Sequence, residues 1–420
     1  MKKNYLLTLL LVLIGIYTIS SQEIFKVMFY NVLDYPEQGP ANRIDNLQII
    51  IEDYQPDIFM ICELNNAAGA DAILAILQNV KSDFERAAFV LNTSDDDIGD
   101  QNNLQNMIFY DASKFNLESQ TEVTTIFRDF NHYTLKLNTV DQATNPVLLN
   151  AIVCHLKSSS GTDNQAFRLQ MVNDLTAYLN TFPNDELVLI GGDLNLYTQS
   201  EPAFQELIDT SNNITFVDPA NRIGSWHENL TYLDVFTQST RTQSGLGGAT
   251  GGFDDRFDFI LTSENMLSDP DLLYVSNSYQ VYGNNGNTNC YNQEINSSNC
   301  SGPDFDQTTR DALYLMSDHL PVTAELQTDE TLLGIDEVTT DHSIRFIDGN
   351  LVTDLLKLNI NLTKLNTDKI LIFNVLGQEM GSYYVKGLNH LRIDVSNWAS
   401  GMYYLVFENR RITPLKFIKK

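Results

Sequence analysis

Eight polar residues stand at the ends of short apolar runs of the kind that form buried strands. Their carboxylates and amides are the hard oxygen ligands that divalent cations prefer, and their imidazoles can bind an anionic oxygen or pass it a proton. Taken singly, each is better explained as a turn cap, a solvated carboxylate or a structural histidine. Taken together, so many functional groups placed against buried runs indicate one catalytic site. The set is Asn31, Glu63, His155, Asp193, Asn195, Asp258, Asp318 and His319.

The elements that must position this set are predicted to be strands alternating with helices. Apolar residues at helical spacing predict helices from Ile44 to about Tyr54, over 71–80, over 165–179 and after Ser200. The closely spaced middle strands favour mixed sheets covered by helices over a purely parallel α/β arrangement. In stacked sheets, polar residues at several strand ends can meet at one edge. β-Branched and aromatic runs predict strands over 24–30, 57–62, 107–110, 133–137, 147–154, 187–190 and 257–261.

The charge of the chain restricts its partners. The 420 residues suit two or three domains. Asp and Glu number 54 against 26 Lys and Arg, for a net charge of −28. That sign repels nucleic acid at long range and argues against binding through a broad basic surface. It still allows an enzyme that meets a phosphodiester through bound cations, because the ions reverse the local sign.

The first residues have the pattern of a targeting segment. Two lysines precede an apolar run from Tyr5 to Ile16, and small and polar residues follow up to Gln22. This pattern predicts a secretory signal peptide over residues 1–21, while the run is too short for the alternative, a spanning helix of about 20 residues. No later stretch is apolar enough to span a bilayer.

The four cysteines fall into two kinds. Cys290 and Cys300 lie in an Asn/Ser-rich stretch with few apolar residues, where export predicts a disulfide between them. Cys62 and Cys154 sit in apolar strand-like runs and are predicted to be buried small hydrophobes. Nothing near them indicates a thiol enzyme.

Two further stretches could be taken for binding sites, but for each of them a plain loop is the favoured interpretation. The glycine-rich stretch Gly245–Gly252 lacks the following Lys-Ser/Thr of a phosphate-binding loop. The run Asp95-Asp96-Asp97 offers carboxylates for a structural Ca²⁺, but a solvated acidic loop is the favoured interpretation.

The domain boundaries follow from changes in composition. A polar stretch from Gln327 to Thr340 separates a body from a tail of some 80 residues, whose alternating apolar and polar residues predict a small β-sandwich. We therefore expect a catalytic domain over 22–327, a linker over 328–340 and a β-sandwich over 341–420.

The body resembles a known superfamily through six motifs that occur in order between Glu23 and Leu326. They are Tyr30-Asn31-Val32-Leu33, Pro56-Asp57-Ile58-Phe59-Met60-Ile61-Cys62-Glu63, Val153-Cys154-His155-Leu156-Lys157-Ser158, Gly191-Gly192-Asp193-Leu194-Asn195, Arg256-Phe257-Asp258 and Ser317-Asp318-His319-Leu320-Pro321. They are similar to those of the endonuclease/exonuclease/phosphatase superfamily, which includes secreted DNases, abasic-site endonucleases, inositol phosphatases and bacterial sphingomyelinases. The stretches around His155 and after Asp193 are most similar to secreted bacterial nucleases. The resemblance implies a four-layer α/β sandwich, two mixed sheets flanked by helices, with the site at one edge.

The resemblance also implies a metal site and a base. Glu63 would hold Mg²⁺ or Mn²⁺, and Asn31 and Asp318 would complete the environment of the cation. Asp193 would position and deprotonate the attacking water, and Asn195 would orient that water and the phosphate.

The remaining implied roles concern the phosphate. His319, its ring held by Asp258, would contact a phosphate oxygen, and His155 would bind the phosphate from the other side and could protonate the leaving oxygen. Arg168 and Lys157 could add phosphate contacts, and solvated charges are an equally favoured interpretation. Some DNases of the superfamily back the equivalent of His155 with a carboxylate, which the corresponding stretch Asn102–Asn106 does not offer. The role of His155 is therefore less secure than that of His319.

The tail has a resemblance of its own. Leu376-Gly377-Gln378, Trp398-Ala399-Ser400-Gly401-Met402-Tyr403-Tyr404 and the basic end Lys416–Lys420 are similar to the C-terminal sorting domain of the type IX secretion system of Bacteroidetes. A plain accessory sandwich is the alternative. The resemblance implies the secretion machinery as a partner, and release from the cell or attachment to its surface.

Three functions remain open at this point. The first is a secreted, metal-dependent nuclease acting on nucleic acid, expected to be a monomer. The second is the same machinery acting on another phosphoester, as in a phosphatase or a sphingomyelinase. The third is a non-enzymatic adhesin on a degenerate scaffold, which the complete set of site residues makes improbable.

Overall fold

The structure is a computed structural model that describes residues 22–94, 104–333, 344–347, 350–360, 369–407 and 415–420. The predictions of a signal peptide over 1–21 and of Ca²⁺ at Asp95-Asp96-Asp97 lie outside these residues. The chain divides into two compact units, residues 1–333 and 334–420, which we call the body and the tail. Among the described residues, no helix has the length and apolarity required to cross a membrane.

Long apolar runs build the first sheet of the body. Its strands are β1 (Glu23–Tyr35), β2 (Ile58–Leu64), β3 (Phe84–Arg86), β4 (Gln105–Asp111), β11 (Leu273–Tyr274), β12 (Gln280–Val281) and β13 (Val322–Thr328). The order is β11-β13-β1-β2-β4-β3, and β12 also pairs with β13. β1 and β2 are parallel, and β13 and β4 flank them antiparallel. Neighbouring residues Met28 and Phe29 are both fully buried, so β1 is covered on both faces.

The second sheet also has a parallel pair of strands flanked by antiparallel ones. Its strands are β5 (Phe115–Val123), β6 (Phe130–Leu137), β7 (Leu148–His155), β8 (Leu187–Asp193), β9 (Phe216–Val217) and β10 (Asp258–Ser263). The order is β5-β6-β7-β8-β10-β9, with a parallel pair, β7 and β8, at the centre. A Cβ on Gly191 in β8 would lie 2.5 Å from the side chain of Met60 in β2. The two sheets therefore pack closely here, and a larger residue at position 191 would require the side chain of Met60 to move.

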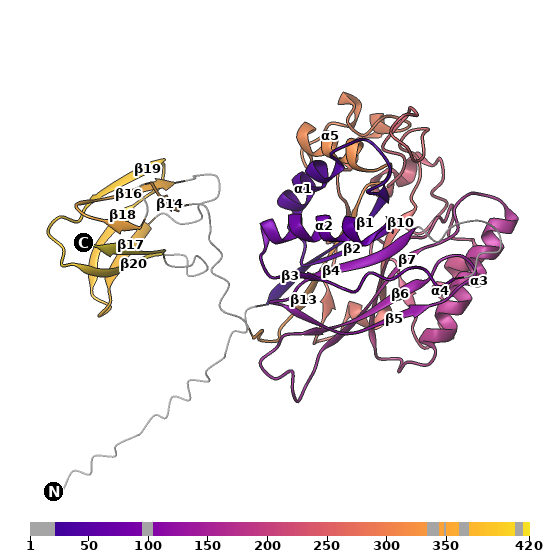
Figure 1. Cartoon of the computed structure of the whole chain (residues 1–420), viewed down its shortest axis with the longest axis horizontal. Coiled ribbons are helices and arrows are strands. Elements are labelled where there is room, and N and C mark those ends of the chain that lie inside the picture. The colour runs from indigo at the N-terminus through magenta and orange to yellow at the C-terminus, as the bar shows by residue number, and fades with distance from the viewer. Residues whose placement is uncertain (1–21, 95–103, 334–343, 348–349, 361–368, 408–414) are drawn as a thin grey trace, which may run out of the picture. The chain divides into compact units, whose positions relative to one another are not determined.

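Helices cover the outer faces of both sheets. They are α1 (Arg43–Tyr54), α2 (Ala67–Val80), α3 (Thr162–Leu179), α4 (Pro202–Leu207) and α5 (Gln307–Met316). Figure 1 shows α1, α2 and α5 on one side of the sheets and α3 and α4 on the other. Short 3₁₀ helices occur at Leu230–Val235, Glu264–Leu267, Thr288–Cys290 and Ser298–Cys300. The predicted four-layer sandwich of two mixed sheets flanked by helices is confirmed.

Sequence patterns found most of these elements and missed a few. β1 does not break at Asn31 but continues to Tyr35 with a register shift between these residues. Helix α5 was not predicted; it follows an N-cap in which the side chain of Asp306 accepts from the backbone N–H of Thr309. The predicted disulfide joins Cys290 and Cys300, and the other two cysteines are buried and free.

The tail is built from strands in two sheets. They are β14 (Ile344–Phe346), β15 (Leu351–Val352), β16 (Leu355–Ile360), β17 (Lys369–Asn374), β18 (Glu379–Tyr384), β19 (His390–Asp394), β20 (Gly401–Phe407) and β21 (Leu415–Lys419). One sheet has the order β14-β16-β19 and the other β15-β21-β20-β17-β18. Alternate residues such as Leu356, Ile372 and Leu405 form a common apolar core, as expected of a small β-sandwich.

Candidate active site

The predicted site residues meet at one edge of the two stacked sheets. Asn31 and Glu63 stand near the carboxyl ends of the parallel strands β1 and β2, and His155 and Asp193 end the parallel strands β7 and β8. In the second sheet Asp193 is paired in register with both His155 and Asp258. β10 is antiparallel to β8, so its first residue lies at the same edge where its neighbours end.

The side chain of Asn31 links the two sheets. Its Nδ2 donates to Glu63 Oε1 at 2.9 Å and to Asp193 Oδ2 at 3.0 Å. The other oxygens are also fixed, because the backbone N–H of Asp34 donates to Glu63 Oε2 and that of Asn195 donates to Asp193 Oδ1. Two carboxylates from different sheets are thereby held around one amide group.

Backbone strain accompanies this arrangement. Glu63 and Asn195 have φ angles of 60° and 50°, in the left-handed region that side chains other than glycine rarely adopt. Such strain costs about 1–2 kcal/mol per residue and gathers at functional sites, where surrounding structure imposes it.

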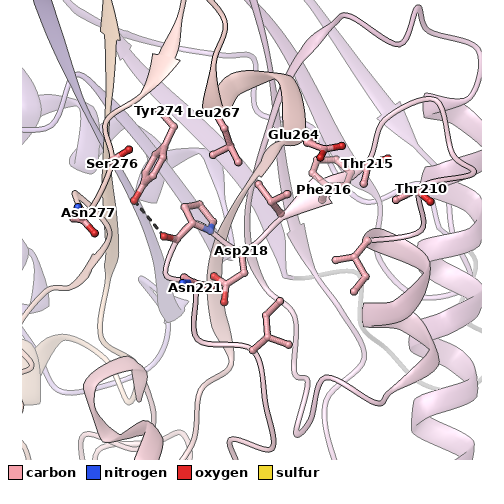
Figure 2. Close-up of a pocket in the computed structure, with 14 residues that line it drawn as sticks. Thr210, Thr215, Phe216, Asp218, Asn221, Glu264, Leu267, Tyr274, Ser276 and Asn277 are labelled. Atoms are coloured by element: carbon pink, nitrogen blue, oxygen red, sulfur yellow. Dashed lines mark hydrogen bonds between the residues drawn. The ribbon is translucent and has the colours of Figure 1, made fainter.

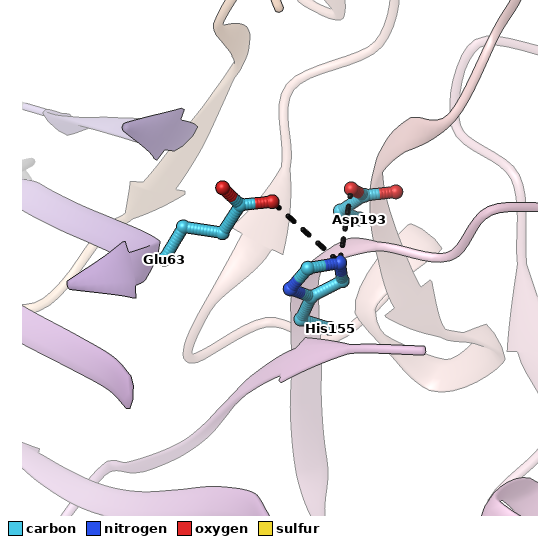
Figure 3. A group of neighbouring side chains, drawn as sticks. All are labelled: Glu63, His155 and Asp193. Atoms are coloured by element: carbon cyan, nitrogen blue, oxygen red, sulfur yellow. Dashed lines mark ion pairs between the residues drawn. The ribbon is translucent and has the colours of Figure 1, made fainter. Parts of the chain in front are cut away.

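The donor atoms of Glu63, His155 and Asp193 suit a hard cation. One ligand atom from each lies within 4.8 Å of the others. His155 Nε2 is 3.8 Å from Glu63 Oε1 and 3.5 Å from Asp193 Oδ2 (Figure 3). Burial, reinforced by the charge of Asp318, raises the pKa of Glu63 to about 7. Burial also raises the pKa of Asp193 to about 7. A divalent cation between these carboxylates would offset both effects, so the residues present fit a metal ion.

His319 and Asp258 form the second part of the site. His319 Nδ1 lies 2.7 Å from Asp258 Oδ2, and both side chains are almost fully buried. Burial by itself would lower the pKa of His319, but the carboxylates of Asp258, Asp318 and Asp193 raise it well above the ordinary value. An imidazolium is therefore favoured, with Nε2 3.8 Å from Asp193 Oδ2.

Two hydroxyl groups hold this pair in place. Thr237 Oγ1 accepts from the backbone N–H groups of Phe257 and Asp258. Ser317 Oγ donates to the carbonyl of Asn31 at 2.7 Å and accepts from the N–H of His319. Ser317 thus ties the Ser-Asp-His motif to β1, on the other side of the site.

His155 has a neutral, buried ring beside both candidate carboxylates. Burial, and then the nearby charge of Arg128, lowers its pKa well below the ordinary value. Its Nδ1 is buried and makes no hydrogen bond to any described residue. A neutral imidazole of this kind can bind a phosphate oxygen or a cation, and the general-acid role that the resemblance implied stays a prediction.

Asp318 lies beside the first cluster and is held by residues that the sequence did not reveal. Its Oδ2 accepts from Gln238 Nε2 at 3.1 Å and from the backbone N–H of Ala249 at 2.6 Å. Gln238 Nε2 also lies 2.6 Å from His319 Nε2. The side chain of Gln238 therefore lies in front of the ring nitrogen of His319 that a phosphate oxygen would contact, and no local pattern in the sequence marks this residue.

The glycine-rich stretch, which was not predicted to bind phosphate, lies against Asp318. Gly248 has a φ of +71°, and a Cβ on it would lie 2.5 Å from the carboxyl carbon of Asp318. The buried guanidinium of Arg241 donates to the carbonyls of Leu246 and Gly247 and thereby holds the loop in place. The backbone at Gly248 approaches a carboxylate so closely that a side chain has no room there. The sequence showed the glycine but not this reason for it.

The two predicted basic contacts behave differently. Arg168 is fully buried; it donates twice to Glu201 and also to the carbonyls of Lys157 and Ser159. The prediction that Arg168 contacts phosphate is therefore corrected, because its donors are used inside the fold. Lys157 is half-buried, and its Nζ donates to the carbonyl of Ser158.

A cavity with a partly apolar lining lies elsewhere in the body. Its volume is about 560 Å³, and its lining includes Phe216, Leu267 and Tyr274 (Figure 2). It also includes Glu264, which follows the last residue of β10, whereas Asp258 begins that strand. The cavity thus lies at the opposite end of β10 from the catalytic candidates.

The C-terminal unit matches a known family. Residues 352–420 match the family model of the secretion system C-terminal sorting domain. The sorting-domain prediction for the tail is confirmed. No curated protein sequence matches the chain.

Solved structures match the body at low sequence identity. The human Nocturnin catalytic domain with bound sulfate anion is 15% identical, with 73% of this chain and 97% of that chain covered and a TM-score of 0.45. An endonuclease/exonuclease/phosphatase from Bacteroides vulgatus is 16% identical, with coverages of 72% and 98% and a TM-score of 0.44. D. rerio TDP2 complexed with single-strand DNA product is 14% identical, with coverages of 72% and 98% and a TM-score of 0.44. The second of these carries the name of the superfamily that the sequence motifs resemble.

Proposed function

We propose that the body is a metal-dependent phosphoesterase of the endonuclease/exonuclease/phosphatase superfamily that hydrolyses phosphodiester bonds. The observation that carries the proposal is the convergence of Glu63 and Asp193 around Asn31, with the His319–Asp258 pair beside them. These groups come from five separate segments of the chain, and packing of two sheets brings them together.

Glu63 is the principal candidate ligand for Mg²⁺ or Mn²⁺, and Asn31, Asp193 and Asp318 are the other oxygen donors near it. When bound, the cation would polarise a phosphoryl oxygen and offset charge that grows on the phosphate. The position of Glu63 supports this role, since its side chain is 14% exposed and can reach an ion that enters from solvent.

The protein's own residues would supply the remaining chemistry. Asp193, oriented by the N–H of Asn195, would take a proton from the attacking water. His319 would hold a phosphate oxygen through Nε2 once Gln238 moves aside, and Asp258 would keep its ring oriented. The transition state gains most from such prearranged donors in a site that excludes water.

Nucleic acid phosphodiesters are the first substrates to test, because the motifs after Asp193 are most similar to secreted nucleases. A phosphatase or sphingomyelinase activity of the same site is the second candidate. The tail supports export through the type IX machinery to the cell surface or the medium.

The decisive experiment replaces Glu63 by Gln in the full chain. The variant keeps size and polarity but loses the charge that holds a hard cation. We expect kcat/KM for phosphodiester hydrolysis to fall by about 10²-fold or more, and the Mg²⁺ requirement to rise. Glu52→Gln removes an equal charge from the exposed side of α1 and should leave the activity unchanged. Activity of the unchanged protein that resists a chelator would overturn the proposal.

A further inference from the structure

The described part of the body has few basic residues, and each of them makes contacts within the protein. Residues 22–333 contain thirteen lysines and arginines against forty-five aspartates and glutamates. All thirteen lie within the described residues, and each is buried or half-buried. The acidic excess noted for the whole chain is thus concentrated in the unit that carries the candidate active site.

Seven of these cationic side chains are buried, and their N–H groups donate to other groups of the protein. Arg128 holds the carbonyls of His155 and Leu156, and Arg241 holds those of the glycine-rich loop. Arg256 forms a two-fold ion pair with Asp218 at 2.8 Å. The buried set is Arg43, Lys114, Arg128, Arg168, Arg241, Arg256 and Arg310.

The half-buried cations are also engaged, most of them with carboxylates. Lys81 pairs with Asp57, Arg86 with Asp71, Lys136 with Glu118, and Arg222 with Asp234. Lys26 donates to the carbonyl of Tyr54 near the opposite end of β1 from Asn31. That leaves Lys157, two residues after His155, as the one half-buried cation near the site without a carboxylate among its contacts.

A protein that tracks a nucleic acid backbone needs several free cations, because each neutralised phosphate requires one. The body offers only Lys157 and the ring of His319 near its site, where the carboxylates of Glu63 and Asp193 also lie. We propose, on the basis of the proposed function, that the substrate is a small phosphodiester of which a single phosphoryl group is held, such as a dinucleotide, and that flanking phosphates add nothing to binding. A bound cation, His319 and Lys157 suffice for one phosphoryl group.

The test compares substrates of increasing length at two salt concentrations with the full chain and Mg²⁺. A dinucleotide, single-stranded oligonucleotides of 4 to 40 residues and long duplex DNA are hydrolysed at 50 and 200 mM NaCl. With at most two cationic side-chain contacts, from Lys157 and His319, kcat/KM per bond should fall by about tenfold or less across this salt range and should not rise with length. A fall of about 10²-fold, or a preference of that size for long DNA, would overturn the proposal.

Variants separate this proposal from the proposed function. Lys157→Met should lower kcat/KM for all lengths by a similar factor and reduce the remaining salt dependence. Lys136→Met breaks a surface ion pair with Glu118 and should change neither. If no phosphodiester is hydrolysed, or if hydrolysis survives Glu63→Gln, the proposed function fails. If hydrolysis depends on Glu63 but grows steeply with chain length, only the present inference fails.

Discussion

At the scale of single residues, the site depends on residues that position the side chains of its other members. Asn31 separates two carboxylates, Asp258 orients His319, and Gly248 leaves room for Asp318. These contacts are short and most of the groups are buried, so changes of a few atoms should have measurable effects.

The His319–Asp258 pair predicts non-additive losses. Asp258→Asn keeps the shape but removes the charge that favours the imidazolium, and should cost about 10²–10³ in kcat/KM, or roughly 2–4 kcal/mol. His319→Ala should cost at least as much, and the double variant little more than His319→Ala alone. A double-mutant cycle on phosphodiester hydrolysis measures the coupling. Fully additive losses would show that the pair is not coupled.

The loop around Gly248 predicts a change in metal dependence. Gly248→Ala would push a methyl group into the carboxylate of Asp318, and we expect the Mg²⁺ concentration for half-maximal activity to rise about tenfold. Gly245→Ala is a matched control, because Gly245 also has a positive φ but nothing lies within 4 Å of its Cβ position. Equal effects of the two substitutions would assign the change to backbone strain alone.

At the scale of elements, two parallel strand pairs create the site. β1 with β2, and β7 with β8, end at the same edge, while β10 and β13 begin there. The edges of the sheets are stabilised elsewhere, for example by His132 of β6. Its ring lies 2.9 Å from both Tyr178 Oη of α3 and Asn150 Oδ1 of β7.

His132 predicts a loss of stability in mild acid. Burial lowers its pKa, so the folded protein keeps the ring neutral while the unfolded chain takes up a proton below its ordinary pKa of about 6.5. Its contribution is fully present above that value and is lost as pH falls toward the lowered folded pKa. His132→Gln should therefore show a smaller drop in Tm between pH 7 and pH 5 than the parent. Parallel Tm curves for the two proteins would contradict this account.

At the scale of the molecule, the chain has two units to which we assign different proposed roles, phosphodiester hydrolysis for the body and export for the tail. The body holds the whole candidate site within residues 31–319, and the tail has its own core and matches the sorting family.

Removal of the tail should therefore separate location from activity. A chain ending at residue 340 should keep its phosphodiesterase activity in cell extracts but disappear from the medium and the cell surface. Fractionation of cells that express the two forms, with activity measured in each fraction, tests this. Unchanged export of the shortened chain would contradict the role proposed for the tail.

The sequence by itself determined the order of the elements and most of the site. Alternation, helical spacing and polar residues at strand ends are local signals, so Glu63, His155, Asp193 and His319 could be found from them. The two disulfide partners were also predictable, because their surroundings offer little else to stabilise a loop.

Only the tertiary structure decided which contacts those residues make. Gln238 reaches Asp318 and His319 across 80 and 81 residues, and Arg168 reaches Glu201 across 33. No local pattern encodes such pairs, since they depend on how two sheets pack face to face. The same holds for the charge of the body: composition gave the excess of carboxylates, but only packing showed that nearly every cation is already bound within the fold.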